Sequence, residues 1–289
     1  LFIFKRVGFF VALNLVVFFM ISIVFTVFGL DHRAGLGQNL QLGPVLVSSM
    51  IIGFVGAFVS LLLPKPMAKW SVGAKPLEPT HWVYQTVATQ AERAGIRTPE
   101  VCVYTSDEPN AFATGAFKNS SMVAVSTGLL NSLTQDEVKA VLGHEVGHIA
   151  NGDMVTMTLL QGVVNTFVVF AARIVGWFVD RVILKNESDA PGMGFYATNI
   201  VLQVVLGIGA SLILAWYSRR REFVADRAGA DLTSNRSMAN ALRRLGGEAP
   251  SQLSGNLQAF GIRGGGGWMA AFSTHPPIEE RVAALEKRV

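Results

Sequence analysis

Four uncharged hydrophobic stretches constrain this chain more than any other feature of its sequence. They cover Phe9–Leu30, Leu42–Leu63, Met154–Ala172 and Ala190–Ser218. Each is long enough for a helix that crosses the roughly 30 Å hydrocarbon core of a bilayer. The chain is 51% hydrophobic and only 15% charged, with a mean hydropathy of +0.41, which is too apolar for an ordinary soluble domain. The sequence therefore predicts a membrane protein.

The two later stretches are less uniform than the two earlier ones. Gln161 and Asn165 interrupt the third stretch, and Pro191 lies near the start of the fourth. Such residues allow a hydrophobic helix to lie partly at the membrane interface or against other protein segments. Phe9–Leu30 is not followed by the small-residue cleavage site of a signal peptide, so we expect a retained anchor.

The cations near these stretches lie at the ends that would share one side of a membrane. Lys5 and Arg6 precede the first stretch, lysines follow the second, and Arg219–Arg221 follow the fourth, whereas the loop 180–189 is acidic on balance. By the positive-inside rule, both termini and both polar regions lie in the cytoplasm. The net charge of +4 thus reflects topology, and we expect no nucleic-acid partner.

The same pattern divides the chain into four parts. Residues 1–63 form two transmembrane helices and 154–218 a hydrophobic helical hairpin, while 64–153 and 219–289 are cytoplasmic. The two cytoplasmic parts must pack together if they share one site.

Helix and strand patterns in the first cytoplasmic part predict a small α+β domain. A helical pattern covers His81–Gly95, and strand patterns cover Val101–Thr105 and Ser121–Thr127. Thr134 and Glu137 have the spacing of a capping box, so a second helix should begin there and end at about Ala150.

The segment His144–His148, with the sequence His-Glu-Val-Gly-His, lies on that second helix. Imidazoles four residues apart face the same side of a helix and can bind one ion, with Glu145 beside it. This arrangement suits a catalytic zinc that holds a water, whose proton a carboxylate removes. The alternative is a helix with two surface histidines that have ordinary partners.

A catalytic zinc needs a third protein ligand, and Glu222 is the best candidate in the sequence. The other histidines are His32, His81 and His275. Asp226 lies four residues after Glu222 on a predicted helix, where it can accept the free ring N–H of a ligand histidine. Alternatively, the two acids only balance the charges of Arg219–Arg221 and Arg227.

Together these motifs resemble a known family. The segments that carry the resemblance are His144–Asp153, Asn110–Gly115, Glu222–Ala230 and Thr274–Pro277. They are similar to the HtpX family of bacterial membrane proteases, which is related to the eukaryotic CAAX prenyl proteases. The resemblance covers nearly the whole chain, including two hydrophobic segments at the start and a hairpin between the second and third ligands.

The resemblance implies a helical membrane protein with a cytoplasmic gluzincin-type metalloprotease domain, built from an active-site helix and a small sheet. In that family one Zn²⁺ is held by residues that match His144, His148 and Glu222, and the residue matching Glu145 is the general base and acid. His275 and Arg281 match positions that face the zinc, where they would bind the oxyanion or orient the substrate. Asn110 is expected to line the same cleft.

The implied activity is hydrolysis of internal peptide bonds in misfolded or damaged membrane proteins and unfolded polypeptides. It would take place at the cytoplasmic face of the bacterial inner membrane, alongside an ATP-dependent membrane protease. We further expect the strand Ser121–Thr127 to be an edge to which an extended substrate adds by backbone pairing.

Two other functions compete with this one. In an intramembrane protease the metal motif would lie inside the bilayer, but the helix begins with the polar segment Thr134–Lys139. A metal-binding membrane scaffold or transporter without proteolytic activity would more often close its metal site with four protein ligands.

Overall fold

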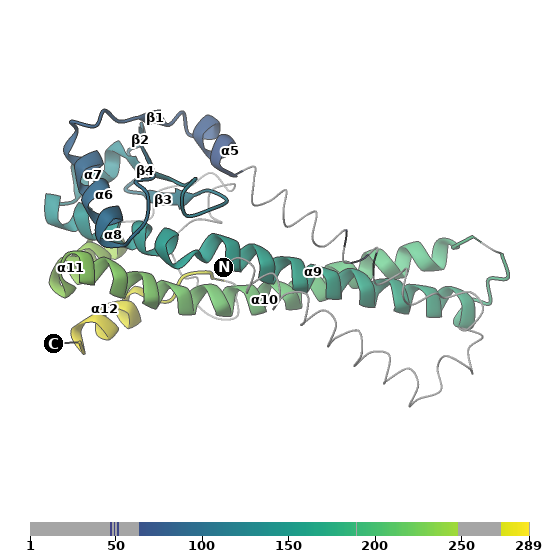
Figure 1. Ribbon diagram of the computed structural model, residues 1–289. Coiled ribbons are helices and arrows are strands. Elements are labelled where there is room, and N and C mark those ends of the chain that lie inside the picture. Colours follow the sequence, from purple (N-terminus) through teal and green to yellow (C-terminus); the bar gives the residue numbers. More distant parts are fainter. Residues whose placement is uncertain are drawn as a thin grey trace. The chain divides into compact units, whose positions relative to one another are not determined.

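The computed structural model describes residues 64–188, 190–247 and 273–288, together with residues 47, 49 and 51 (Figure 1). The hydrophobic stretch Phe9–Leu30, and Leu42–Leu63 apart from these three positions, lie outside the described residues. The chain divides into two compact units. One contains residues 1–60 and 156–214, and the other contains 61–155 and 215–289. Each unit is described by itself below.

The second unit is a helix-rich fold around a four-stranded sheet of order β1-β2-β4-β3. The strands are β1 (Lys75–Pro76), β2 (Glu100–Tyr104), β3 (Ala111–Thr114) and β4 (Met122–Ser126). β4 is parallel to β2 and antiparallel to β3. The two predicted strands are therefore present within a residue of their expected bounds, while β1 and β3 were not predicted.

The prediction that Ser121–Thr127 is an edge strand is wrong, because β4 pairs on both sides. All five residues of β4 are buried. Val123 and Val125 face one layer of the core, while Met122 and Ala124 face the other. A strand that is covered on both faces does not alternate between polar and apolar residues. An apolar run of this kind is typical of a strand inside a sheet. The edge on this side of the sheet is β3.

In the part of the chain that the structure describes, four helices contact this sheet (Figure 1): α5 (Pro64–Ser71), α6 (Trp82–Arg93), α7 (Thr127–Ser132) and α8 (Gln135–Asn151). Beyond α8, α11 (Asn235–Gly247) packs on α8, and α12 (Ile278–Glu286) packs on α11. The predicted capping box opens α8, with Glu137 Oε2 2.8 Å from the Thr134 nitrogen. Gly152 ends α8 at a positive φ of 67°, which glycine adopts without strain.

Small residues let α8 lie very close to α10 (Met193–Leu232), a single helix of 40 residues. A Cβ added to Gly147 would lie 2.7 Å from the Cβ of Ala228, and one added to Gly143 would lie 3.1 Å from the Cα of Gly229. Each distance is shorter than an ordinary carbon–carbon contact. The glycine inside the His-Glu-Val-Gly-His segment thus sets how near α8 comes to the helix that carries Glu222.

The first unit contains most of the hydrophobic hairpin. α9 (Asp153–Phe178) continues into a π-helical turn at Val179–Ile183, and α10 returns beside it (Figure 1). Both helices are long and apolar enough to cross a membrane. Side chains of Ile200, Val201 and Val204 are at least 60% exposed, although they are apolar. A large apolar surface of this kind is favourable against lipid.

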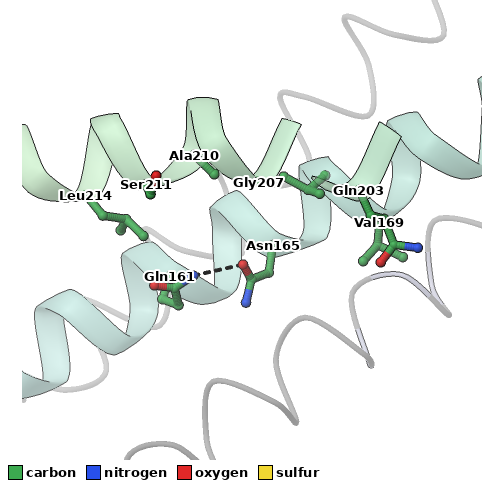
Figure 2. A pocket seen from close by; sticks show the side chains of 9 residues that line it. Gln161, Asn165, Val169, Gln203, Gly207, Ala210, Ser211 and Leu214 are labelled. Atoms are coloured by element: carbon green, nitrogen blue, oxygen red, sulfur yellow. Dashed lines mark hydrogen bonds between the residues drawn. The ribbon is translucent and has the colours of Figure 1, made fainter. Parts of the chain in front are cut away.

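The polar residues of the third stretch face α10 (Figure 2). Gln161 and Asn165 line a cavity of about 480 Å³ together with Gln203, Ser211 and apolar residues of both helices. The Gln161 Nε2 also donates to Asn165 Oδ1 at 2.8 Å. Their amides are therefore directed into the hairpin, as is usual for polar groups at membrane depth.

Asp180 closes the turn between the two hairpin helices. Its carboxylate is buried and accepts from the Gly192 nitrogen at 3.0 Å and from Asn186 Nδ2 at 2.8 Å. The Phe195 nitrogen, in the first turn of α10, also donates to it at 3.3 Å. An acid at the start of a helix satisfies N–H groups that have no partner within the helix.

Candidate active site

His144, His148 and Glu222 come together at the contact of α8 with α10. The Nε2 atoms of the two histidines lie 3.1 Å apart, and His148 Nε2 lies 3.2 Å from Glu222 Oε1. One donor atom from each residue lies within 4.8 Å of the others. Two imidazoles and one carboxylate form a donor set that zinc prefers in hydrolases. The residues present therefore fit a catalytic zinc.

Asp226 supports the first of these histidines. Its Oδ1 lies 2.9 Å from His144 Nδ1, which leaves Nε2 for the metal. Arg281, from α12, binds both oxygens of Asp226 through Nε at 2.8 Å and a terminal nitrogen at 2.6 Å. Another Arg281 nitrogen lies 3.2 Å from Glu222 Oε2. Arg281 is only 3% exposed, so the structure places its guanidinium against two carboxylates rather than in an open cleft.

Asp153 supports the second histidine, a role that is not among those predicted from the sequence. Its Oδ2 lies 2.8 Å from His148 Nδ1, and its Oδ1 accepts from Arg221 Nε at 2.7 Å. Burial alone lowers the pKa of His148, but hydrogen bonds with Asp153 and Glu222 outweigh this effect and raise the pKa to about 10. The position of an acid just after the end of the metal helix was the available signal for Asp153.

Glu145 lies beside the donor cluster, next to the sheet edge. Burial raises the pKa of its carboxyl group, while nearby His144 and His148 act in the opposite direction. The backbone of Ala113, in edge strand β3, also hydrogen-bonds to the carboxylate. A raised pKa makes a carboxylate a stronger base and so favours uptake of a proton.

His275 approaches the cluster from the segment before α12. Its Nδ1 lies 2.8 Å from Glu222 Oε2. Its side chain is 26% exposed, whereas that of Glu222 is 5% exposed. The structure therefore brings His275 to the candidate ligand and leaves part of its ring accessible.

Asn110 directly precedes the edge strand β3 and forms two hydrogen bonds. Its backbone nitrogen donates to Ser126 Oγ at 2.9 Å, and its side chain hydrogen-bonds to Tyr104. Burial raises the pKa of Tyr104 to about 12, so this hydroxyl stays protonated. Asn110 therefore hydrogen-bonds to an uncharged group. Asn110 is partly exposed, which is compatible with the cleft position expected for it.

The chain is similar to known proteins over most of its length. Residues 78–289 match peptidase family M48. The chain is 54% identical to the protease HtpX homolog of Bordetella pertussis and 53% identical to that of Leptothrix cholodnii, and each alignment covers at least 98% of both chains. The crystal structure of Ste24p from S. mikatae has a similar fold, with a TM-score of 0.62 at 20% identity. That match covers 92% of this chain and 66% of Ste24p, slightly less than two thirds of its length.

Proposed function

Because this chain belongs to peptidase family M48, and is therefore a zinc-dependent membrane metalloprotease, we propose that His144, His148 and Glu222 hold its zinc. The convergence of their three donor atoms within 4.8 Å carries this assignment. Zinc bound there would polarise the scissile carbonyl and lower the pKa of a bound water. The remaining steps belong to side chains around the metal.

Glu145 is proposed to move the proton. Its carboxylate takes a proton from the attacking water and later gives it to the leaving amine, so one residue serves both steps. The raised pKa that burial gives Glu145 favours uptake of the proton from the water. His275, whose Nδ1 contacts Glu222, is proposed to donate to the oxyanion, while Arg281 positions Glu222 and Asp226.

The substrate is proposed to add to β3 rather than to β4. The Ser126 nitrogen donates to the Asn110 carbonyl at 2.9 Å, and Phe112 pairs with Ala124 two residues later. Because facing residues alternate in an antiparallel pair, the backbone groups of Ala111 and Ala113 point away from β4. Among the described residues no strand pairs with the outer side of β3. Backbone pairing there with Ala111 and with the carbonyl of Ala113, whose N–H faces Glu145, would place an extended peptide beside Glu145 without reading its side chains. Loose specificity of this kind suits unfolded substrates.

We also propose a location and a role for the enzyme. The names of its relatives and the cation pattern support a multi-pass protein of the bacterial inner membrane with a cytoplasmic gluzincin-type site. Misfolded or damaged membrane proteins would be its substrates, and an ATP-dependent membrane protease its partner in quality control. Reporter fusions after Lys69 and within the 186–189 loop test the topology. Opposite sides are expected, and a cytoplasmic signal at Asn186 would contradict a spanning hairpin.

The proposed activity is tested with Glu145→Gln, which keeps the shape of the side chain but cannot act as a base. Wild-type protein purified in detergent should contain one zinc and cleave casein, whereas Glu145→Gln should keep the zinc and lose cleavage. Zinc without cleavage in the wild type would instead favour a metal-binding scaffold or transporter.

A further inference from the structure

The Asp153–Arg221 pair joins the two ends of the membrane hairpin at the candidate metal site. Asp153 is the first residue of α9, and Arg221 lies near the end of α10, directly before Glu222. Arg221 reaches Asp153 Oδ1 with Nε at 2.7 Å and with a terminal nitrogen at 2.5 Å. The other oxygen of Asp153 lies 2.8 Å from His148 Nδ1. The carboxylate therefore serves two partners with separate oxygens.

We propose that Asp153 is the positioning residue of His148 and that Arg221 acts only through Asp153. This inference rests on the metal site proposed above. Asp153 accepts the Nδ1–H of His148, which stops rotation of the ring and makes Nε2 the nitrogen that gives up its proton when a metal binds. A histidine so held presents Nε2 to the same point as Glu222 Oε1, 3.2 Å away.

Burial explains why Asp153 needs a cation. The residue is 6% exposed, and a desolvated carboxylate is costly unless it is paired and hydrogen-bonded. The planar fork of arginine can donate twice to one carboxylate, whereas lysine offers a single point charge. Arg221 directly precedes Glu222 on α10. Its contact with Asp153 therefore also holds the turn of α10 that carries the third candidate ligand next to Asp153.

His144 has the same arrangement from different elements. Asp226 holds its Nδ1 at 2.9 Å, and Arg281 holds Asp226 with two donors. Each candidate ligand histidine thus has one aspartate, and each aspartate has one arginine. An ion pair formed only for surface stability would not require this repetition at both histidines.

The test measures metal affinity in full-length protein in detergent, by chelator competition with zinc, for Asp153→Ala, Arg221→Ala and the double variant. We expect Asp153→Ala to weaken zinc binding about 10–100-fold, the range typical for loss of such a partner. Arg221→Ala should weaken it less. The double variant should match Asp153→Ala alone, because an arginine that acts through Asp153 has nothing left to orient.

A spectroscopic readout separates positioning from general stability. The visible spectrum of the Co²⁺-substituted protein should change in Asp153→Ala, because the geometry of the His148 ligand changes. The control is Asp231→Ala, which removes an aspartate paired with Arg288 at 2.8 Å elsewhere in the same unit and should leave metal affinity and spectrum unchanged. Asp153→Asn, which keeps the volume of the side chain, should show a smaller shift in the same direction if Asp153→Ala does not fold.

Unchanged zinc affinity and an unchanged Co²⁺ spectrum in Asp153→Asn and Asp153→Ala would overturn the proposal. Additive losses in the double variant would overturn the role of Arg221. Because these readouts do not depend on cleavage, they remain distinct from the Glu145→Gln test, whose failure would refute the proposed activity alone.

Discussion

His275 Nδ1 lies 2.8 Å from Glu222 Oε2, so the histidine from the C-terminal segment contacts the candidate third ligand directly. A carboxylate only accepts hydrogen bonds, and Nδ1 is therefore the donor in this contact. Only Nε2 is left to act on a substrate. This geometry gives His275 one anchored nitrogen and one available nitrogen.

We predict that His275→Ala keeps its zinc but loses activity. Loss of one oxyanion donor costs about 10²–10³ in kcat in well-studied hydrolases, and KM should stay nearly unchanged. Zinc content, thermal melting and kcat are to be measured on one preparation. A near-normal kcat, or a loss explained by a lower Tm, would show that His275 only stabilises the segment before α12.

Glu222→Ala and Asp226→Ala should fail in different ways. The first removes a proposed metal bond and should abolish tight zinc binding. The second removes an orienting partner, with a loss of about 10–100-fold. It also leaves the buried Arg281 without its bidentate partner, which typically costs about 3–5 kcal/mol of stability. Zinc titration and thermal melting distinguish the two, and equal small zinc losses would place the third ligand elsewhere.

Gly147→Ala should separate α8 from α10. The new Cβ would lie 2.7 Å from that of Ala228, so one helix must move, at a cost of about 1–3 kcal/mol. Since Glu222 lies on the displaced helix, zinc affinity should fall together with the Tm. Gly207→Ala is the matched control, because a Cβ at that position on α10 meets no atom within 4 Å. Wild-type zinc affinity in Gly147→Ala would mean that the close contact is not needed for the site.

The negative charge of Glu137 should stabilise the protein at neutral pH, and this stabilisation should be lost in acid. Burial alone raises the pKa of Glu137, but hydrogen bonds from Thr134 and the nearby Arg244 outweigh it and hold the pKa below 4.5. A lowered carboxyl pKa contributes stability above the unfolded-state value, and this contribution is lost as the pH falls through the folded-state value. Glu137→Gln, which can still form the capping box, should therefore melt earlier than wild type at pH 7.

The difference in Tm between Glu137→Gln and wild type should shrink as the pH falls below about 4.5, where Glu137 of the unfolded chain takes up a proton, and should vanish below the lower pKa of the folded state. The exposed Glu279→Gln, in the first turn of α12, serves as the control substitution. A constant difference at all pH values would show that shape, rather than charge, determines the effect.

The helix of the metal motif could be predicted from sequence because its signals are local. Thr134 and Glu137 mark its start, and the spacing of His144 and His148 places both on one face. The predicted helix His81–Gly95 agrees with α6, for which His81 is the N-cap. Short-range hydrogen bonds and periodicity decide these features, so no knowledge of tertiary contacts was needed.

Contacts between distant segments were harder to predict. The strand order depends on β3, whose four residues carry no clear alternation, and its omission made β4 look like an edge. The partners of Arg281 are the buried carboxylates Asp226 and Glu222, and neither is near it in sequence. The role of Asp153 likewise depends on Arg221, 68 residues away.

The Asp153–Arg221 contact also means that the peptidase unit is a single domain with an insertion. The chain leaves this unit after Val155 and returns at Ala215, yet Asp153 and Arg221 lie within hydrogen-bonding distance. Chain ends that already lie together can be joined by a short loop at little entropic cost. The intervening membrane segment is therefore not needed to connect the two halves of the peptidase unit. A water-soluble peptidase core should be obtainable by replacing this segment with a few flexible residues in a chain that also lacks residues 1–63.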